Sequence, residues 1–176
     1  MPSQQRSHHR QSLRLKNYDF AKPSTYFVTI CVQDRLNLFG SVVGAKTALN
    51  DAGPMIVRWW NELANKFPSI ELDAFVVMPD HVHGIIRVHA LPEIELHPTL
   101  GAIVGWYKTM TTDDYISGVK QLGWTPFAGR LWQRNYWERV VRDEAALHRI
   151  REYIVNNPHL WSAKHQATLR GRLYFS

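Results

Sequence analysis

Four stretches of the chain carry the β-branched and aromatic residues that favour β-strands. They cover residues 25–32, 70–77, 82–88 and 131–141. The first stretch is β-branched and aromatic along its length, which predicts a strand in the middle of a sheet. The second and third are separated by the turn dipeptide Pro79-Asp80, so they predict two antiparallel strands joined by a tight turn. Residues 34–44 indicate a loop or a short hairpin.

Three further stretches have apolar residues at helical spacing. The first helix follows a cap at Asn50 or Asp51 and ends at Pro68. The second follows a cap at Thr99, and beyond it the Gly- and Pro-bearing residues 118–129 predict a flexible connection. The apolar face of this second helix consists of Leu100, Ile103, Val104, Tyr107 and Met110.

The third helix is expected to begin after a cap at Asp143 and to stop at Pro158, because helical geometry is disfavoured for the residue before a proline. Its buried stripe consists of Leu147, Ile150 and Ile154. One edge of the helix is shared by Arg149, Tyr153 and Asn157, which are four residues apart. From the helix alone, Tyr153 is an amphipathic rim residue and Asn157 a C-cap whose oxygen can turn outward.

The order of these elements is β-α-β-β-α-β, followed by one more helix. It predicts an α+β protein with a ferredoxin-like split βαβ sandwich, in which an antiparallel sheet carries helices on one face. The first and third strands would be central. We expect a basic, flexible arm over residues 1–24, one folded domain over residues 25–161 and a basic tail over residues 162–176.

The composition of the chain indicates a class of binding partner and a cellular compartment. Lysine and arginine exceed aspartate and glutamate by 21 − 15, a net charge of +6, and the chain has seven tryptophans and seven tyrosines. A basic domain rich in aromatic residues favours a polyanion with stackable bases, which is nucleic acid. No run of 18 apolar residues and no secretory signal is present, so we expect no membrane partner, and the only cysteine, Cys31, fits a reducing cytosol.

A pair of histidines in the third predicted strand is the first candidate for chemistry. Because side chains alternate along a strand, His81 and His83 point the same way and Val82 points into the core. Their Cα atoms would lie roughly 6.5–7 Å apart, so the two imidazoles can converge on one ion. Alone, the pair is also compatible with an ordinary strand in a histidine-rich chain.

The histidine pair and the third helix together suit chemistry on a phosphodiester. His81 and His83 could hold a divalent cation, with Asn157 as a third, oxygen ligand, which leaves open positions for phosphate oxygens. Tyr153, one helical turn from Asn157, would reach the same phosphate as an oxygen nucleophile. Its phenol has an unperturbed pKa of about 10, and a bound cation would stabilise the phenolate.

These residues resemble the single-tyrosine HUH transposases of short insertion sequences, and more narrowly the REP-associated tyrosine transposases. His81-Val82-His83 matches the His-hydrophobic-His motif, and Asp80 stands where the family commonly has asparagine. The block from Tyr153 to Pro158 matches the family's Tyr-Ile-x-x-Asn-Pro block. Further similar blocks begin at Arg14, Tyr26, Leu131 and Val141, so the resemblance extends from about Arg14 to Trp161.

The resemblance implies a DNA-cleaving and strand-transferring enzyme of the bacterial cytoplasm, associated with the nucleoid. Its substrate would be single-stranded or hairpin DNA from palindromic repeats. Tyr153 would form a 5′-phosphotyrosine link and leave a free 3′-OH, which later attacks the link to rejoin the strand. The metal would be Mg²⁺ or Mn²⁺, held by His81, His83 and Asn157. A homodimer, with the tyrosine acting in cis or in trans, is left open.

Contacts with DNA are expected from basic side chains around the proposed site and in the arm. The candidates are Arg134, Arg139, Arg142, Arg149, Arg151, Arg14 and Lys16. Trp132 and Trp137 could stack on bases, although tryptophan in a strand more often belongs to the core.

Three alternative functions remain open from the sequence. One is another HUH nuclease, a replication initiator or a relaxase, although those proteins usually carry further domains. A second is a domesticated DNA- or RNA-binding protein that has lost cleavage. A third is a histidine metal-storage or sensor protein, which would need neither Tyr153 nor a basic arm.

Overall fold

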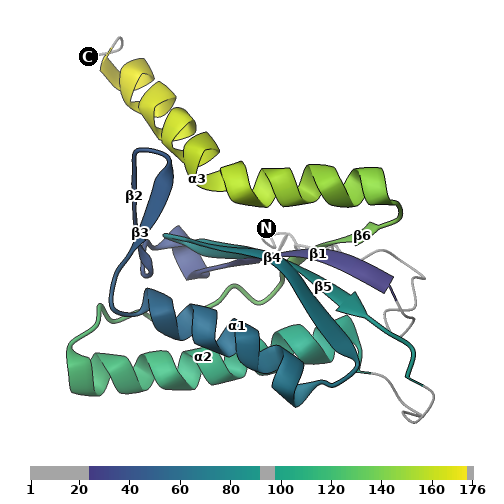
Figure 1. Ribbon diagram of the computed structural model, residues 1–176. Helices are drawn as coiled ribbons and strands as arrows, with labels where there is room; N and C mark the ends of the chain where they lie inside the picture. Colours follow the sequence, from purple (N-terminus) through teal and green to yellow (C-terminus); the bar gives the residue numbers. More distant parts are fainter. Residues whose placement is uncertain (1–23, 92–97, 174–176) are drawn as a thin grey trace, which may run out of the picture.

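A computed structural model describes residues 24–91 and 98–173 of the chain. The predicted basic arm, including Arg14 and Lys16, lies outside these residues apart from its last position, Ser24. Figure 1 shows a main sheet with helices on both sides of it and a separate two-stranded hairpin. Within the described part of the chain, no helix is both long and apolar enough to cross a membrane.

Four antiparallel strands make up the main sheet in the order β4-β5-β1-β6. Their bounds are Ser24–Cys31 for β1, Ile70–Met78 for β4, His81–Val88 for β5 and Trp137–Val141 for β6. The first and third predicted strands, β1 and β5, are central, and this order is that of the ferredoxin-like sandwich. The predicted fold class is therefore confirmed, with β4 and β5 joined by the expected Pro79-Asp80 turn.

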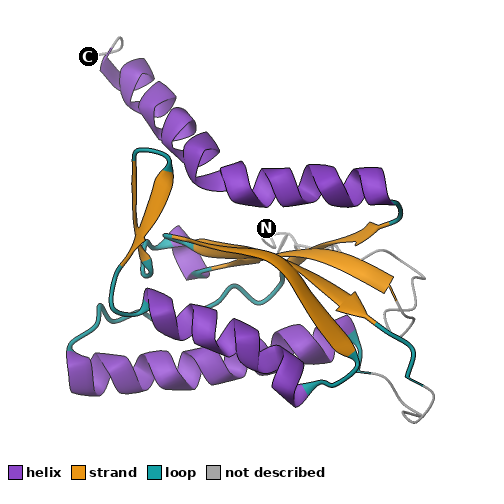
Figure 2. Cartoon of the chain, viewed as in Figure 1, coloured by secondary structure: helices purple, strands orange, loops and turns teal. Residues whose placement is uncertain are grey.

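Helices α1 (Gly53–Lys66) and α2 (Leu100–Leu122) cover one face of the sheet, and α3 (Glu144–Leu173) covers the other (Figures 1 and 2). The main core lies between the sheet and the α1–α2 layer. The predicted stripe of α3 packs on Ile85 of β5 as a second, smaller cluster with Leu147, Ile150 and Ile154. The two histidines of β5 therefore face α3, because they alternate with core-facing residues.

Gly84 explains how β5 lies so close to α1. A Cβ atom at this position would come within 2.3 Å of the Trp60 ring, so only glycine leaves room for that ring. Trp60 is 2% exposed and stacks on Phe75 of β4 with ring centroids 4.3 Å apart. The rings of Trp60 and Phe75 therefore pack against the strand that carries the histidines, on the face that points toward α1.

The caps predicted for α2 and α3 agree with the structure, whereas the cap predicted for α1 at Asn50 or Asp51 and the end predicted for α2 do not. Ala52 is the N-cap of α1 and makes no side-chain capping bond, and the Asn50 side-chain oxygen accepts from the Ala52 N–H before the helix begins. Thr99 and Asp143 accept hydrogen bonds from the backbone N–H groups of Ala102 and Ala146, as predicted for caps of α2 and α3. However, α2 continues through Gly118 to Gly123, whose positive φ of 71° ends it. Gly118 lies inside the helix because the Trp124 ring packs where a Cβ would be.

The predicted fourth strand, residues 131–141, was too long. Strand β6 begins at Trp137, and Trp132 forms only an isolated bridge with Val32. Between them the Lys108 ammonium donates hydrogen bonds to the carbonyls of residues 133, 134 and 135, so this backbone is satisfied outside the sheet. The predicted loop or hairpin at residues 34–44 is a hairpin shifted along the chain, with β2 over Gly40–Val43 and β3 over Lys46–Leu49.

The predicted stop of the third helix at Pro158 was wrong. Helix α3 runs on to Leu173 with Pro158 inside it, and Figure 1 shows it bending midway. Proline has no N–H to donate to the carbonyl of Ile154 and its ring crowds that turn, which bends a helix without always ending it. Asn157 is consequently a residue of the helix interior and not a C-cap.

Candidate functional site

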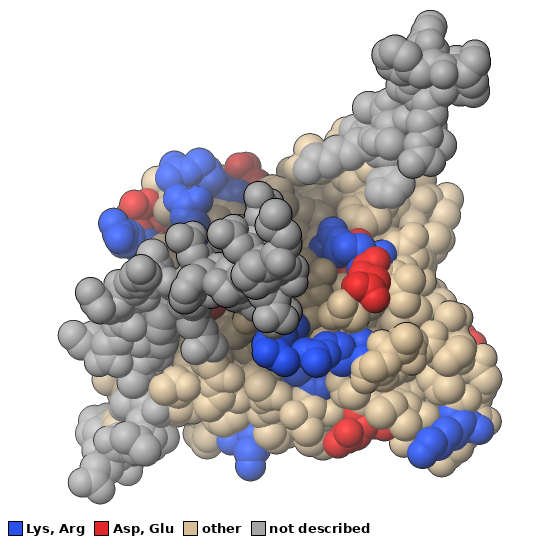
Figure 3. All heavy atoms as spheres, turned by 180° about the vertical axis from the view of Figure 1, so that it is seen from behind, with Lys and Arg blue, Asp and Glu red and all other residues tan. Residues whose placement is uncertain are grey.

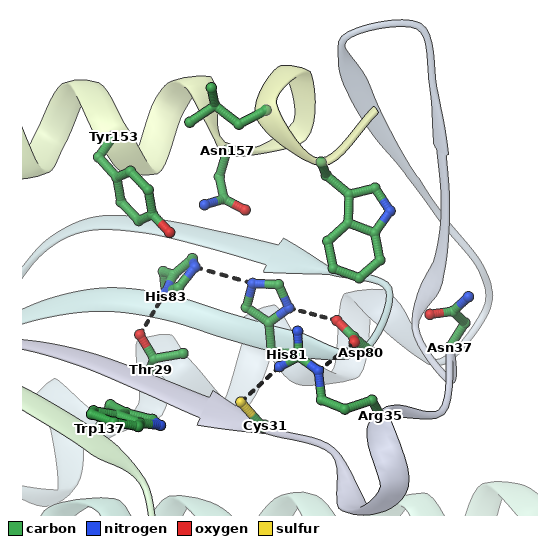
Figure 4. A pocket seen from close by; sticks show the side chains of 12 residues that line it. Thr29, Cys31, Arg35, Asn37, Asp80, His81, His83, Trp137, Tyr153 and Asn157 are labelled. Carbon is green, nitrogen blue, oxygen red and sulfur yellow. Dashed lines mark hydrogen bonds and ion pairs between the residues drawn. The ribbon is translucent and has the colours of Figure 1, made fainter. Parts of the chain in front are cut away.

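The two histidines lie side by side on the α3 face of the sheet. Register places His81 opposite Cys31 and His83 opposite Thr29, and both histidines are about 95% buried. Their Nε2 atoms face each other at 3.0 Å (Figure 4). The Nδ1 atoms point away, toward Asp80 Oδ1 at 2.6 Å and toward the Thr29 hydroxyl at 2.7 Å. The predicted orientation of the pair is what the structure has.

The ring nitrogens of the two histidines have different partners. A carboxylate only accepts, so His81 donates its Nδ1–H to Asp80, while its Nε2 faces His83 Nε2 in the pocket. Burial lowers the pKa of His83 to about 3, and the charges of His81 and Arg35 act in the same direction. His83 is therefore neutral near pH 7, and neutral imidazole is the form that ligates a metal.

Asp80 in turn is held by Arg35, a residue that the sequence analysis missed. Arg35 Nε lies 2.7 Å from Asp80 Oδ2, and its Nη1 donates to the sulfur of Cys31 at 2.8 Å. Both Asp34 and Arg35 have positive φ, 55° and 56°, which is a strained conformation for residues other than glycine. This turn directs the guanidinium toward Asp80, and no pattern in the local sequence predicts the turn.

Helix α3 contributes Tyr153 and Asn157, one turn apart. Ile154 between them is 1% exposed and anchors the helix to the sheet. The Tyr153 ring lies edge-on to His83, with centroids 5.3 Å apart, and also edge-on to Phe27 at 6.0 Å. Figure 4 shows the Tyr153 hydroxyl and the Asn157 amide both pointing toward the histidine pair. The predicted nucleophile and the three predicted metal ligands thus meet in one place.

These side chains line one open pocket of about 600 Å³ between the sheet and α3. The remaining lining residues are Thr29, Cys31, Arg35, Asn37, Asp80, Trp137, Leu160 and Trp161. Trp161 closes one side, with its ring centroid 5.6 Å from that of His81. The pocket combines two imidazoles, two amides, a phenol and a carboxylate with one guanidinium, a set that suits a metal ion and a phosphate together.

The residues fit a divalent cation with octahedral coordination. Two neighbouring ligands about 2.1 Å from an octahedral ion lie about 3.0 Å apart, which is the separation of the two Nε2 atoms. Within residues 24–91 and 98–173, no three His, Cys, Asp or Glu side chains gather in a metal-binding arrangement. A third protein ligand beside the histidines would have to be of another type, and the buried amide of Asn157 is oriented for it.

The predicted DNA-binding arginines that the structure describes lie at different places on the molecule. Arg139 and Arg149 line a second pocket of about 450 Å³ that adjoins the first, whereas Arg134 lines a third one, about 360 Å³, beside α2. Arg151 is joined to Asp73 of β4 by two hydrogen bonds of 2.9 and 2.6 Å, which fasten α3 to the sheet. Arg142 is exposed. Figure 3 shows basic side chains near the middle of the face opposite to that of Figure 1.

The two candidate stacking tryptophans differ in burial. Trp132 is 4% exposed and its indole N–H donates to the Thr111 hydroxyl at 2.8 Å, so it belongs to the core. Trp137 is 58% exposed at the start of β6 and lines both pockets beside α3. The core interpretation is therefore correct for Trp132 and wrong for Trp137.

Comparisons with known proteins show which family this chain resembles. An uncharacterized protein of Haemophilus influenzae is 35% identical over 173 residues, covering 88% of this chain and 91% of the relative. A second protein of that organism, named as a REP-associated tyrosine transposase, is 28% identical over 149 residues, 82% of this chain and 76% of the relative. The solved structure of a REP-associated tyrosine transposase bound to a REP hairpin has the same fold, with a TM-score of 0.57 at 20% identity, over 86% of this chain and 74% of that one.

The family model for IS200-like transposases matches residues 46–157, a segment that begins at β3 and ends at Asn157. It includes both histidines and Tyr153, so the matched segment contains the proposed nucleophile and metal ligands. The resemblance inferred from the histidine and tyrosine motifs is confirmed at the level of the family. This chain belongs to the family of IS200-like transposases.

Proposed function

We propose that this protein is a metal-dependent endonuclease and strand transferase for single-stranded DNA. It cleaves hairpin or palindromic-repeat DNA through a 5′-phosphotyrosine intermediate and then rejoins it. The observation that carries this proposal is the convergence of Tyr153 and Asn157 from α3 with His81 and His83 from β5 on one pocket. A phenol next to a cation site is what an oxygen attack on a phosphodiester requires.

Each residue has a defined task in this reaction. His81, His83 and Asn157 would hold Mg²⁺ or Mn²⁺, which when bound polarises the scissile phosphate as a Lewis acid. The Tyr153 phenol loses its proton to water and its oxygen forms a bond to phosphorus. The bond from phosphorus to the 3′ oxygen of the preceding nucleotide breaks, and that oxygen takes up a proton from water to become the free 3′-OH. In the reverse step a 3′-OH attacks the phosphotyrosine and releases Tyr153, so no external energy source is needed.

Two observations support hairpin DNA as the substrate, one for nucleic acid in general and one for the hairpin. The chain has a net charge of +6, and the solved neighbour of the same fold is bound to a REP hairpin. Two basic residues, Arg139 of β6 and Arg149 of α3, flank the proposed cleavage site and can contact the DNA backbone. We place this activity in the bacterial cytoplasm, on nucleoid DNA, and the protein would act as a monomer or a homodimer.

The test is formation of a covalent adduct. The protein is incubated with end-labelled hairpin DNA carrying single-stranded flanks and Mn²⁺, and an SDS-resistant complex is sought. We expect an adduct with the native protein, none with Tyr153→Phe and a normal one with the control Tyr136→Phe. Tyr136 is a matched control because its ring packs on Lys108, 5.4 Å from the ammonium, and does not line the pocket.

Peptide mapping should place the 5′-phosphate on the peptide that contains Tyr153. An adduct that persists in Tyr153→Phe, or one that maps to Tyr136, would show that the nucleophile is assigned wrongly. Tight hairpin binding without any adduct, at every divalent metal tried, would favour the alternative of a domesticated binding protein.

A further inference from the structure

A second pocket lies directly beside the proposed cleavage site, between α3 and the edge strand β6. It has a volume of about 450 Å³ and shares Trp137 and Tyr153 with the first pocket. We propose that this pocket holds one unpaired nucleobase next to the scissile phosphate, stacked on the Trp137 indole. The inference rests on the proposed function and adds to it the site that positions the DNA strand.

The register of the sheet connects the two pockets. Thr29 of β1 pairs with His83 of β5 on one side and with Trp137 of β6 on the other, so these three residues form one row on the α3 face. Figure 4 shows Thr29 between His83 and Trp137. Two strand spacings separate the ends of the row, roughly 9.5 Å between Cα atoms. A base attached to a phosphate at the histidines could therefore reach the indole.

Exposure distinguishes Trp137 from the other tryptophans. All seven lie in the described part of the chain, and only Trp137 is exposed, at 58%. Tyr153 on the opposite wall is 42% exposed, while Phe27 and Ile150 form an apolar floor. Every nucleobase has an aromatic face, and stacking on such a surface needs no particular sequence.

Charge favours a nucleotide over an apolar peptide in this pocket. Arg139 stands next to Phe27 across the β1–β6 ladder, and Arg149 is on α3, so a guanidinium borders the apolar floor on each side. Both arginines can contact phosphates flanking a stacked base. Glu138 also contributes to the wall, but residues alternate along β6, so its side chain belongs to the opposite face of the sheet.

Fluorescence of 2-aminopurine tests the pocket separately from cleavage. The base analogue is placed at either nucleotide flanking the scissile phosphate, and binding is measured with Tyr153→Phe, which cannot form an adduct. We expect quenching at one of the two positions, loss of that quenching when Trp137→Ala is added, and retention with Trp137→Phe. Equal quenching with Trp137 and with Trp137→Ala would overturn the proposal.

Abasic substrates provide a double-mutant cycle in the native background. Removal of the base at the quenched position and Trp137→Ala should each weaken hairpin binding by about 5- to 150-fold, the range expected for one stacked base. Together they should do no more than either alone, whereas two multiplying losses would contradict a shared contact. If Trp137→Ala leaves DNA binding unchanged and instead shifts the sedimentation of the protein, the pocket is an interface between copies and the proposal is wrong. Absence of any adduct with intact DNA would refute the proposed function, a result independent of the quenching.

Discussion

Removal of the Asp80 carboxylate should weaken metal binding without any change to the metal ligands themselves. Asp80 is 3% exposed and accepts two short hydrogen bonds, from His81 Nδ1 at 2.6 Å and from Arg35 Nε at 2.7 Å. The first bond fixes the His81 tautomer and orientation and increases the electron density that Nε2 can donate. Asp80→Asn and Asp80→Ala remove this support to different degrees.

The expected loss of metal affinity follows from the hydrogen bonds that each variant keeps. Changes to carboxylates that orient a ligating histidine typically cost 10- to 100-fold in metal affinity. Asparagine can still accept from His81 but would turn its NH₂ group toward Arg35, so we expect about a 10-fold loss for Asp80→Asn. Alanine leaves the buried Nδ1–H of His81 without an acceptor, so we expect about a 100-fold loss and about 1–3 kcal/mol lower stability for Asp80→Ala.

Calorimetric titration with Mn²⁺, in the absence of DNA, measures the affinity directly, and the Mn²⁺ concentration for half-maximal adduct formation measures it in the reaction. Asp73→Asn is the matched control, because it removes the same charge from a residue that binds Arg87 and Arg151 and does not line the pocket. If Asp80→Ala remains folded by circular dichroism and binds Mn²⁺ as tightly as the native protein, the proposed support of His81 is refuted.

Three further predictions concern the histidines, the Asp73 ion pair and the N-terminal arm. His81→Ala or His83→Ala should abolish cleavage while hairpin binding, measured by mobility shift, mostly survives; full cleavage by either variant, or by native protein in EDTA, would exclude the metal site. Hydrogen bonds from Arg151 lower the pKa of Asp73 to about 2, so the ion pair stabilises the fold above about pH 4 and is lost as pH falls toward 2. Asp73→Asn should lower the free energy of unfolding at pH 7 by about 1 kcal/mol, since Arg151 is partly exposed to water, and the difference from native should vanish in acid. Residues 1–22 contain five basic residues and one acid. Their deletion should lower the slope of log affinity against log salt by roughly 0.7–0.9 for each phosphate that the protein no longer binds. An unchanged slope would show that the arm does not touch DNA.

Local periodicity was sufficient to predict most of the site. Alternation along a strand places His81 and His83 on one face, and helical spacing places Tyr153 and Asn157 on one edge, whatever the rest of the fold does. Both patterns remain valid because each is a property of one regular element. The meeting of the two elements in space was inferred from their chemistry and is not encoded in either stretch alone.

Contacts that depend on irregular backbone could not be predicted. Arg35 reaches Asp80 through a turn with two positive φ angles, and its sequence separation of 45 positions has no periodic signature. The exposure of Trp137 could not be predicted from the sequence for a related reason. The predicted strand is interrupted at residues 133–136 by hydrogen bonds to Lys108, so alternation cannot be carried from Trp132 to Trp137.

The bend at Pro158 shows how a wrong boundary bears on function. A helix that stopped there would leave Asn157 as a mobile cap and the pocket open at that end. Instead α3 continues beyond the bend beside the β2–β3 hairpin, and the Ser162 hydroxyl donates to the Gly44 carbonyl at 2.6 Å. Trp161 is thereby held against His81, and Asn157 is held in a buried turn of helix. The proline that sequence rules assign to a helix end therefore lies where α3 changes direction, between the turn that carries Tyr153 and Asn157 and the segment that closes the site.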